Sequence, residues 1–282
     1  MDNDDEMYIL LLLADSNLPT GSFVASAGLE SYVAHGFLSQ NSSSSIIDFV
    51  QDSLPSYAHL ALPFVSDAHR IISTYANAKN SPENNQDEVD RAVKKLIGLD
   101  ELYEVMTLNH VARRASKAQG IALLTLYSKG FSRPLSISSN IDEPIRLHEA
   151  RLTQLLDQYK VLIRSEETPG HLPVCWGMLT GALGLTLERS QYLHLFLHAR
   201  SLLSASVRLN NIGPYGSQQI LLHAVRPLVA TEAAKCRMLR TGELDEDKDG
   251  FNRTTHGPAN TWPLGDILAA RHDQQHSRIF NS

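Results

Sequence analysis

Apolar residues recur every three or four positions along most of this chain, which is the spacing of one face of an α-helix. Within residues 189–211 one such stripe contains Tyr192, Phe196, Ala199, Leu203 and Val207. Similar spacing predicts helices over residues 7–14, 22–35, 44–78, 99–128, 144–163, 173–187, 215–240 and 264–275. Strand-like alternation is not convincing anywhere, so the pattern predicts an all-α fold with about ten helices in a single compact domain.

Prolines and polar segments set the expected ends of these helices. Pro55 and Pro63 lie inside the apolar stretch 44–78, and proline lacks a backbone N–H and clashes with the preceding helical turn. We therefore expect two helices there. The apolar run 7–14 follows acidic residues, whereas a secretory signal begins with basic ones, so it is expected to be a buried helix. The polar segments 77–88, 132–142 and 241–260 are expected to be loops.

The whole chain, residues 1–282, is interpreted as one domain. Its helical core is expected over 7–240, a mobile loop over 241–263, and a C-terminal helix with a partner-docking tail over 264–282. Hydrophobic residues make up 43% of the sequence, which is enough for a sizeable core.

Charge and cysteine content exclude several classes of partner. The formal net charge of −6 argues against nucleic acid and against anionic membrane surfaces, because both require a basic face. No apolar stretch approaches the roughly 20 residues that cross a bilayer. Only two cysteines occur, Cys175 and Cys236, and this sparse content is typical of a reducing compartment. We expect a cytoplasmic protein.

Motifs for phosphate binding and nucleophilic catalysis are absent from the sequence. There is no phosphate-binding loop of the Gly-x-x-x-x-Gly-Lys-Ser/Thr type and no Gly-x-Ser-x-Gly elbow. Gly177, Gly181 and Gly184 have a spacing that favours close contact between helices over a phosphate loop. The sequence therefore predicts that the chain is not an enzyme.

Two histidine pairs are candidate metal ligands. His194 and His198 are four residues apart on an expected helix, and His272 and His276 repeat this spacing, so each pair shares a face. Leu195 stands where a zinc hydrolase would carry its general-base glutamate. Because no carboxylate or cysteine completes either set, we favour surface or half-buried histidines that bind no metal, and we expect no resident cofactor.

A turn-rich segment near the N-terminus, residues 13–30, reads LADSNLPTGSFVASAGLE. It predicts a helix end, a tight turn through Pro19 and Gly21, and a second helix in which Gly28 permits close backbone contact. The segment resembles the N-terminal signature of the UreF family of urease accessory proteins, with matches that include Asp15, Pro19, Gly21, Phe23, Ser26, Gly28 and Glu30.

Two later segments carry the same resemblance. Residues 171–218 are similar to the C-terminal helical half of the family, and the sequence Gly213-Pro-Tyr-Gly216 is similar to its eukaryotic branch. The chain ends in Ser-Arg-Ile-Phe-Asn-Ser, which resembles the family's C-terminal tail. The resemblance implies partner-binding roles for Arg208, Gly213, Tyr215, Gln218, Arg271, His272, Ser277, Arg278, Ile279 and Phe280.

Alternatives remain for two of these assignments. Arg208 is either an interface residue or a surface arginine that interacts favourably with the end of its helix. The tail either docks on a partner or folds back on its own domain, and we favour partner docking because arginine and aromatic anchors are frequent hot spots. On that interpretation, removing Ser277–Ser282 would leave the melting temperature nearly unchanged.

The resemblance implies a non-catalytic role in assembly. A UreF-like protein is expected to act as a homodimeric scaffold that bridges UreD (also called UreH) and the GTPase UreG on apo-urease, where nickel is inserted. Nickel would then be handled by the complex. Two alternatives remain: a regulator of GTP hydrolysis by UreG, which would require a suitable arginine or a water-positioning residue, and a metallochaperone that binds nickel through the histidine pairs.

Overall fold

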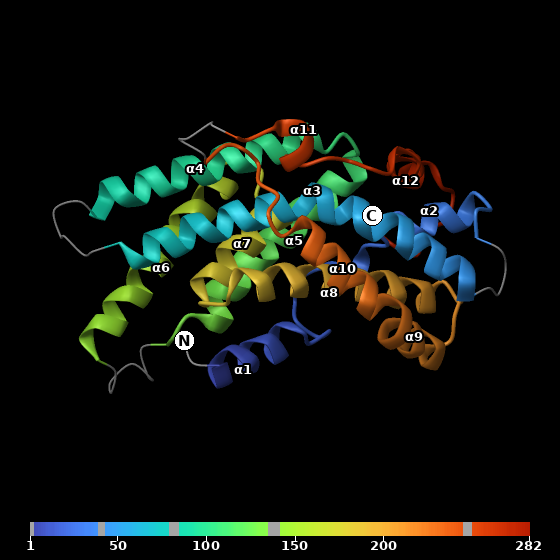
Figure 1. Ribbon diagram of the computed structural model, residues 1–282, viewed down its shortest axis with the longest axis horizontal. Coiled ribbons are helices and arrows are strands. Elements are labelled where there is room, and N and C mark those ends of the chain that lie inside the picture. The colour runs from blue at the N-terminus through green and yellow to red at the C-terminus, as the bar shows by residue number, and fades with distance from the viewer. Residues whose placement is uncertain (1–2, 39–42, 79–84, 135–141, 245–249) are drawn as a thin grey trace.

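The computed structural model describes residues 3–38, 43–78, 85–134, 142–244 and 250–282 (Figure 1). Within these ranges all regular structure is helical, so the predicted all-α class is confirmed. The α-helices are α1 (Asn3–Leu13), α2 (Leu29–Ala34), α3 (Ser43–Asn77), α4 (Asn85–Met106), α5 (His110–Leu126), α6 (Glu143–Arg164), α7 (Leu172–Ala182), α8 (Leu187–Arg208), α9 (Pro214–Ile220), α10 (Arg226–Cys236), α11 (Arg253–His256) and α12 (Pro263–Ala270). Shorter helical turns are η1 (Ser22–Val24), η3 (Tyr127–Phe131), η5 (Leu221–Val225) and η6 (Arg271–Gln274).

Helix α3 is the central element of the molecule. It runs along the long axis in Figure 1 and packs against α4, α7, α8 and α10. Helices α2 and α12 lie together at one end, and the beginning of α6 lies at the other. In the described part of the chain, no helix is both long enough and apolar enough to cross a membrane.

The expectation that prolines divide residues 44–78 was wrong, because α3 is one helix of 35 residues that contains Pro55 and Pro63. A proline at position 63 leaves the carbonyl of His59 without its usual helical donor. In the structure that carbonyl accepts a hydrogen bond from the backbone N–H of Ala259, at 3.3 Å. A segment 200 residues away along the chain thus replaces the missing bond, and the helix continues.

Other expected boundaries also changed. The expected helix 22–35 is divided into η1 and α2, because Gly28 adopts a left-handed conformation with a φ of 87° immediately before α2. The expected helix 99–128 is divided at Asn109, whose side chain accepts hydrogen bonds from the N–H groups of Val111 and Ala112 and caps α5. Helix α4 begins at Asn85, inside the segment expected to be a loop.

Helix α1 is not the buried helix that the sequence predicted. Its side chains Met7, Tyr8 and Leu11 are 54%, 65% and 65% exposed. The apolar run therefore forms a helix with one uncovered apolar face. An apolar segment of eight residues does not by itself show whether its helix is buried or exposed.

Close contact between α3 and α7 confirms the prediction for Gly177 and Gly181. A Cβ atom on Gly177 would lie 2.5 Å from the carbonyl oxygen of Val65, and one on Gly181 would lie 3.0 Å from the Cβ of Ile72. Any larger residue would push the two helices apart. Gly184 instead has a φ of 75° after the end of α7, where it allows the chain to turn.

The carboxylate of Asp100 joins three elements in the core. Asp100 is fully buried on α4. It accepts hydrogen bonds from the Tyr159 hydroxyl at 2.8 Å, the Thr168 hydroxyl at 2.8 Å, and the backbone N–H groups of Gly170 and His171 at 2.5 and 2.8 Å. His171 is the N-cap residue of α7, so the negative charge also faces the positive end of that helix dipole.

The segment expected as a loop over 241–263 makes several contacts with the core, with residues 245–249 outside the described ranges. The backbone N–H and the hydroxyl of Thr241 both donate to the Asp67 carboxylate, at 2.8 and 2.6 Å. The ring of Trp262 meets that of Phe49 edge-on, with centroids 5.4 Å apart. These contacts hold both ends of the segment against α3.

We predict that Asp100→Asn lowers the free energy of unfolding by about 3 kcal/mol, because the amide NH₂ would face groups that are themselves donors. Urea denaturation followed by circular dichroism measures this change. The neighbouring, exposed Glu101 provides the control, and Glu101→Gln should change stability by no more than about 0.5 kcal/mol. Equal effects for the two variants would contradict the assigned role of Asp100.

Candidate functional site

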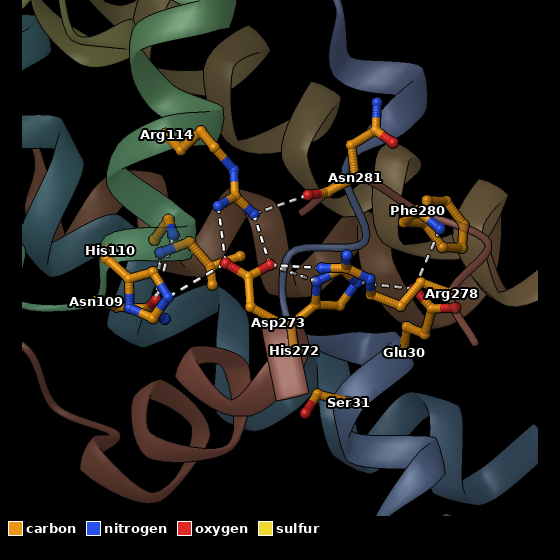
Figure 2. Close-up of polar contacts among 12 residues, drawn as sticks. Glu30, Ser31, Asn109, His110, Arg114, His272, Asp273, Arg278, Phe280 and Asn281 are labelled. Atoms are coloured by element: carbon orange, nitrogen blue, oxygen red, sulfur yellow. Dashed lines mark hydrogen bonds and ion pairs between the residues drawn. The ribbon is translucent and has the colours of Figure 1, made fainter. Parts of the chain in front are cut away.

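The N-terminal motif and the C-terminal tail meet at one surface, which we call the tail-docking surface (Figure 2). Its centre is Glu30, in the first turn of α2 and only 6% exposed. The Glu30 carboxylate accepts hydrogen bonds from the ring N–H (Nε2) of His272 at 2.9 Å and from the backbone N–H groups of Ile279 and Phe280 at 2.6 and 3.2 Å. One motif residue therefore holds both η6 and the tail.

A second carboxylate, Asp273, forms an ion-pair cluster beside Glu30 (Figure 2). Arg114 of α5 donates two hydrogen bonds to it, each of 2.8 Å, and Arg278 of the tail donates one of 2.7 Å. His110 lies 3.3 Å away. The Arg114 hydrogen bonds, followed by the charges of Arg114 and Arg278, hold the pKa of Asp273 well below its usual value. The cluster links α5, η6 and the tail.

Arg208, at the end of α8, lies between two aromatic rings. Its guanidinium carbon is 3.8 Å from the centre of the Phe23 ring and 4.1 Å from that of the Phe280 ring. Cation–π contacts of this kind are worth about 0.5–2 kcal/mol, more when they are desolvated. Burial lowers the pKa of Arg208, and the negative charge of Glu30 opposes that shift. Arg208 thereby connects a motif residue to a tail residue.

Backbone contacts complete this surface. The N–H of Asn281 donates to the carbonyl of Val24 at 2.9 Å, and the N–H of Ser26 donates to the carbonyl of Ser282 at 2.5 Å. Gly28 approaches α12 so closely that a Cβ atom there would lie 2.9 Å from the Cβ of Ala269. This is the close backbone contact that the sequence predicted for Gly28.

The tail folds back on its own domain in the structure, which is the placement that we disfavoured from the sequence. Phe280 is 2% exposed and belongs to the core. Ile279, by contrast, is 61% exposed, and Ser277 and Arg278 also lie at the surface. Phe280 therefore holds the tail in place, while Ile279 presents an apolar side chain to solvent. Binding of a partner through the tail stays a prediction.

The other expected partner-binding residues lie elsewhere. Gly213, Tyr215 and Gln218 are exposed at the beginning of α9, which packs against α8 and α3. Tyr215 is 87% exposed. Arg271 is exposed at the start of η6. The structure thus brings Arg208 to the tail and leaves the α9 residues on a separate exposed turn.

The remaining motif residues shape the turn before η1. The side chain of Asp15 accepts a hydrogen bond from the N–H of Asn17 at 2.9 Å, and Gly21 has a φ of 73°. Pro19 lies between them at the surface. The predicted tight turn is therefore present, and it places Phe23 beside Arg208.

The first histidine pair lines a cavity of about 300 Å³ that lies beside the motif. The ring of His198 stacks on Tyr57 with centroids 3.7 Å apart, and the Nε2 atom of His194 lies 2.8 Å from the Tyr57 hydroxyl. Burial lowers the pKa of each histidine to about 3. Both rings are therefore neutral at pH 7 and packed against an aromatic residue. His194 and His272 are 3% and 0% exposed, so the expectation of surface or half-buried histidines was wrong for these two. His272 of the second pair is bound to Glu30, while His276 is exposed.

Sequence reasoning missed the residues that hold the tail from α5 and η6. Arg114 has no sequence signal, because it is one of many charged residues on a helix surface. Asp273 lies within the segment that carried the resemblance, but no local pattern distinguishes it from the other acidic residues of the chain. Asn109 caps α5 and also donates from its amide to the carbonyl of Asp266 at 3.2 Å. Its position before an apolar helical run was the available signal.

We predict that Phe280→Ala destabilises the protein by about 3 kcal/mol, since it removes a buried aromatic side chain. The neighbouring variant Ile279→Ala should stay within about 0.5 kcal/mol of wild type, because that side chain is exposed. Removal of Ser277–Ser282 should likewise lower the melting temperature, contrary to the expectation from the sequence. Urea denaturation of the two substitution variants and thermal unfolding of the truncated chain test this, and wild-type stability after truncation would contradict the tail-docking surface.

A second prediction concerns acid. Because the folded-state pKa of Asp273 is lowered, its ion pairs contribute stability fully above the unfolded value of about 3.9 and lose it as the pH falls toward the folded value. The difference in unfolding free energy between wild type and Asp273→Asn should be constant above about pH 5 and shrink below about pH 4. Urea denaturation at a series of pH values measures it, and a difference independent of pH would refute the assignment.

The tail-docking surface is both charged and apolar. It consists of carboxylates neutralised by arginine and histidine, of main-chain hydrogen bonds, and of exposed apolar side chains such as Phe23, which is 64% exposed. Arginine and aromatic residues of this kind are enriched in protein interfaces.

Known proteins are similar to this chain over most of its length. The family model named UreF matches residues 41–225. The chain is 43% identical to urease accessory protein 6 of Cryptococcus neoformans, across 98% of this chain and 97% of that protein. It is 30% identical to a UreF-like urease accessory protein of Schizosaccharomyces pombe, across 100% and 99%, and 28% identical to urease accessory protein F of Oryza sativa, across 99% and 86%. The chain belongs to the UreF family of urease accessory proteins.

Proposed function

We propose that this chain is a non-catalytic assembly component of urease maturation, which bridges UreD (UreH) and the GTPase UreG on apo-urease in the cytoplasm. The observation that carries this proposal is the relationship to a urease accessory protein over nearly the full length of both chains. The match covers 98% of this chain and 97% of that relative, so nearly the whole domain is similar. In this proposal nickel is the cargo of the complex.

The exposed apolar side chains support a role in binding other proteins. Ile279 of the tail, Val24 of the motif and Tyr215 of α9 are 61%, 44% and 87% exposed. Met7, Tyr8 and Leu11 add the uncovered face of α1. An uncovered apolar helix face such as that of α1 is a frequent mark of protein interaction sites. The predicted homodimer would cover part of this area, and the partners would cover the rest.

The tail-docking surface supports one specific contact, that with UreD. Its ion pairs and the buried Phe280 hold the backbone of residues 278–281 in a defined conformation before any partner arrives. A preformed segment loses little conformational entropy when it binds. Ile279 is the side chain that this arrangement turns outward, so we assign it as the apolar anchor.

We predict that Ile279→Ala weakens capture of UreD at least about tenfold while the fold is retained, because truncation of an interface anchor costs more than about 1.4 kcal/mol. Co-expression with UreD and UreG followed by quantitative pull-down measures the effect. Ile145→Ala is the matched control, since Ile145 is 48% exposed in the first turn of α6 and takes no part in the tail-docking surface.

Two outcomes would count against the proposal. Equal UreD capture by both variants and by wild type would remove Ile279 from the interface. Failure of the wild-type chain to capture either UreD or UreG would contradict the bridging role itself. Turnover of a small molecule by the purified chain would contradict the non-catalytic assignment.

A further inference from the structure

A group of metal-ligating side chains lies where α10 meets α3, outside the tail-docking surface and apart from the histidine pairs. Among the described residues, His59, Glu232 and Cys236 each offer one ligand atom, and these atoms all lie within 4.8 Å of one another. Glu232 and Cys236 are four residues apart on α10 and share one of its faces. His59 comes from α3, which packs against α10. The fold thus assembles a nitrogen, an oxygen and a sulfur donor.

The Glu232 carboxylate is only half satisfied by the described part of the protein. Glu232 is 2% exposed, and its Oε1 atom accepts a hydrogen bond from the Lys235 ammonium group at 2.7 Å. Its Oε2 atom is buried, with no hydrogen-bond partner among the described residues. A buried carboxylate oxygen without a partner lowers the stability of the fold, because its desolvation is not compensated. A cation or a hydrogen-bond donor at this position would compensate it.

The spacing of the other two donors suits a tetrahedral ion. The His59 Nδ1 and Cys236 Sγ atoms are 3.6 Å apart. Zinc–nitrogen and zinc–sulfur bonds of about 2.05 and 2.3 Å at the tetrahedral angle place nitrogen and sulfur about 3.6 Å apart. The two ligand atoms are therefore already separated as a bound ion would require. For three bonds to form, the carboxylate has to approach and Nδ1 has to give up its hydrogen bond to the Pro55 carbonyl.

We propose that His59, Glu232 and Cys236 form a binding site for a divalent transition-metal ion of intermediate softness, with Zn²⁺ as the best fit. Thiolate and imidazole ligands disfavour Mg²⁺ and Ca²⁺, which prefer oxygen alone. Three protein ligands leave the fourth tetrahedral position for water or for a group from a partner. This site does not depend on the proposed function, because it concerns a different face of the core.

Binding at this site exchanges protons in a defined way. Burial raises the pKa of the Cys236 thiol to about 12, so the metal-free sulfur carries a proton, which leaves to solvent as the metal–sulfur bond forms. The Nδ1 atom of His59 lies 2.9 Å from the Pro55 carbonyl. A carbonyl only accepts, so Nδ1 carries the ring proton, and coordination moves that proton to Nε2.

Titration of the reduced, chelator-treated full chain with Co²⁺ tests the proposal, since a cobalt–thiolate bond gives a charge-transfer absorption in the near ultraviolet. We expect saturation at one equivalent, loss of the band when Zn²⁺ is added, and a rise in melting temperature with Zn²⁺. A parallel titration with Ni²⁺ determines which ion is preferred. The Cys236→Ser variant should lose the band, and His59→Gln should bind at least tenfold more weakly.

Cys175→Ser provides the matched control. Cys175 is also a free, buried cysteine, but it lies on α7 and is not part of this group. The control should keep the band at wild-type intensity, and circular dichroism confirms that each variant is folded. The proposal fails if wild type shows no band, if the band survives in Cys236→Ser, or if Cys175→Ser removes it. Because the titration contains no partner protein, its failure would leave the bridging role unaffected.

Discussion

The backbone of α7 lies so close to α3 that two glycines are required where the helices cross. Gly177 and Gly181 leave no space for a side chain, since a Cβ atom on either would meet atoms of Val65 or Ile72 within 3.0 Å. Because α3 also contacts α4, α8 and α10, this crossing determines where the rest of the core lies. The buried Asp100 also holds the N-terminus of α7 in place, because it accepts hydrogen bonds from the N–H groups of Gly170 and His171.

On this core the two ends of the chain are brought together. Glu30 and Asp273 are each shared by several donors, so the motif, α5, η6 and the tail hold one another in place (Figure 2). Nearly all of this stabilisation comes from residues that are far apart in the sequence. The buried Glu30 and the half-buried Asp273 order the backbone of the tail, while the side chain of Ile279 stays exposed.

The packing of α3 against α10 also brings the three metal-ligating side chains together. Helix α3 passes through both Pro55 and Pro63 without a break, and this continuity places His59 opposite Glu232 and Cys236. A helix ending at either proline would direct His59 elsewhere. The carbonyl of His59 is in turn bound by Ala259, so the segment after α11 helps to preserve the continuity.

By itself the sequence determined the helical class, the separation of the glycines for helix contact, and the turn of the motif, because each depends on spacing or conformation within a few residues. Only the tertiary structure decided that α3 is unbroken, that α1 is exposed and that Phe280 is buried. Each of these depends on contacts between segments that are distant in the sequence. Ala259 binds the His59 carbonyl in α3, Arg208 packs on Phe280, and the apolar face of α1 is left uncovered. For the metal-ligand group, too, the sequence shows one part and the tertiary structure adds the other. The spacing of Glu232 and Cys236 is visible in the sequence, whereas His59 joins them through helix packing, and no local pattern records that contact.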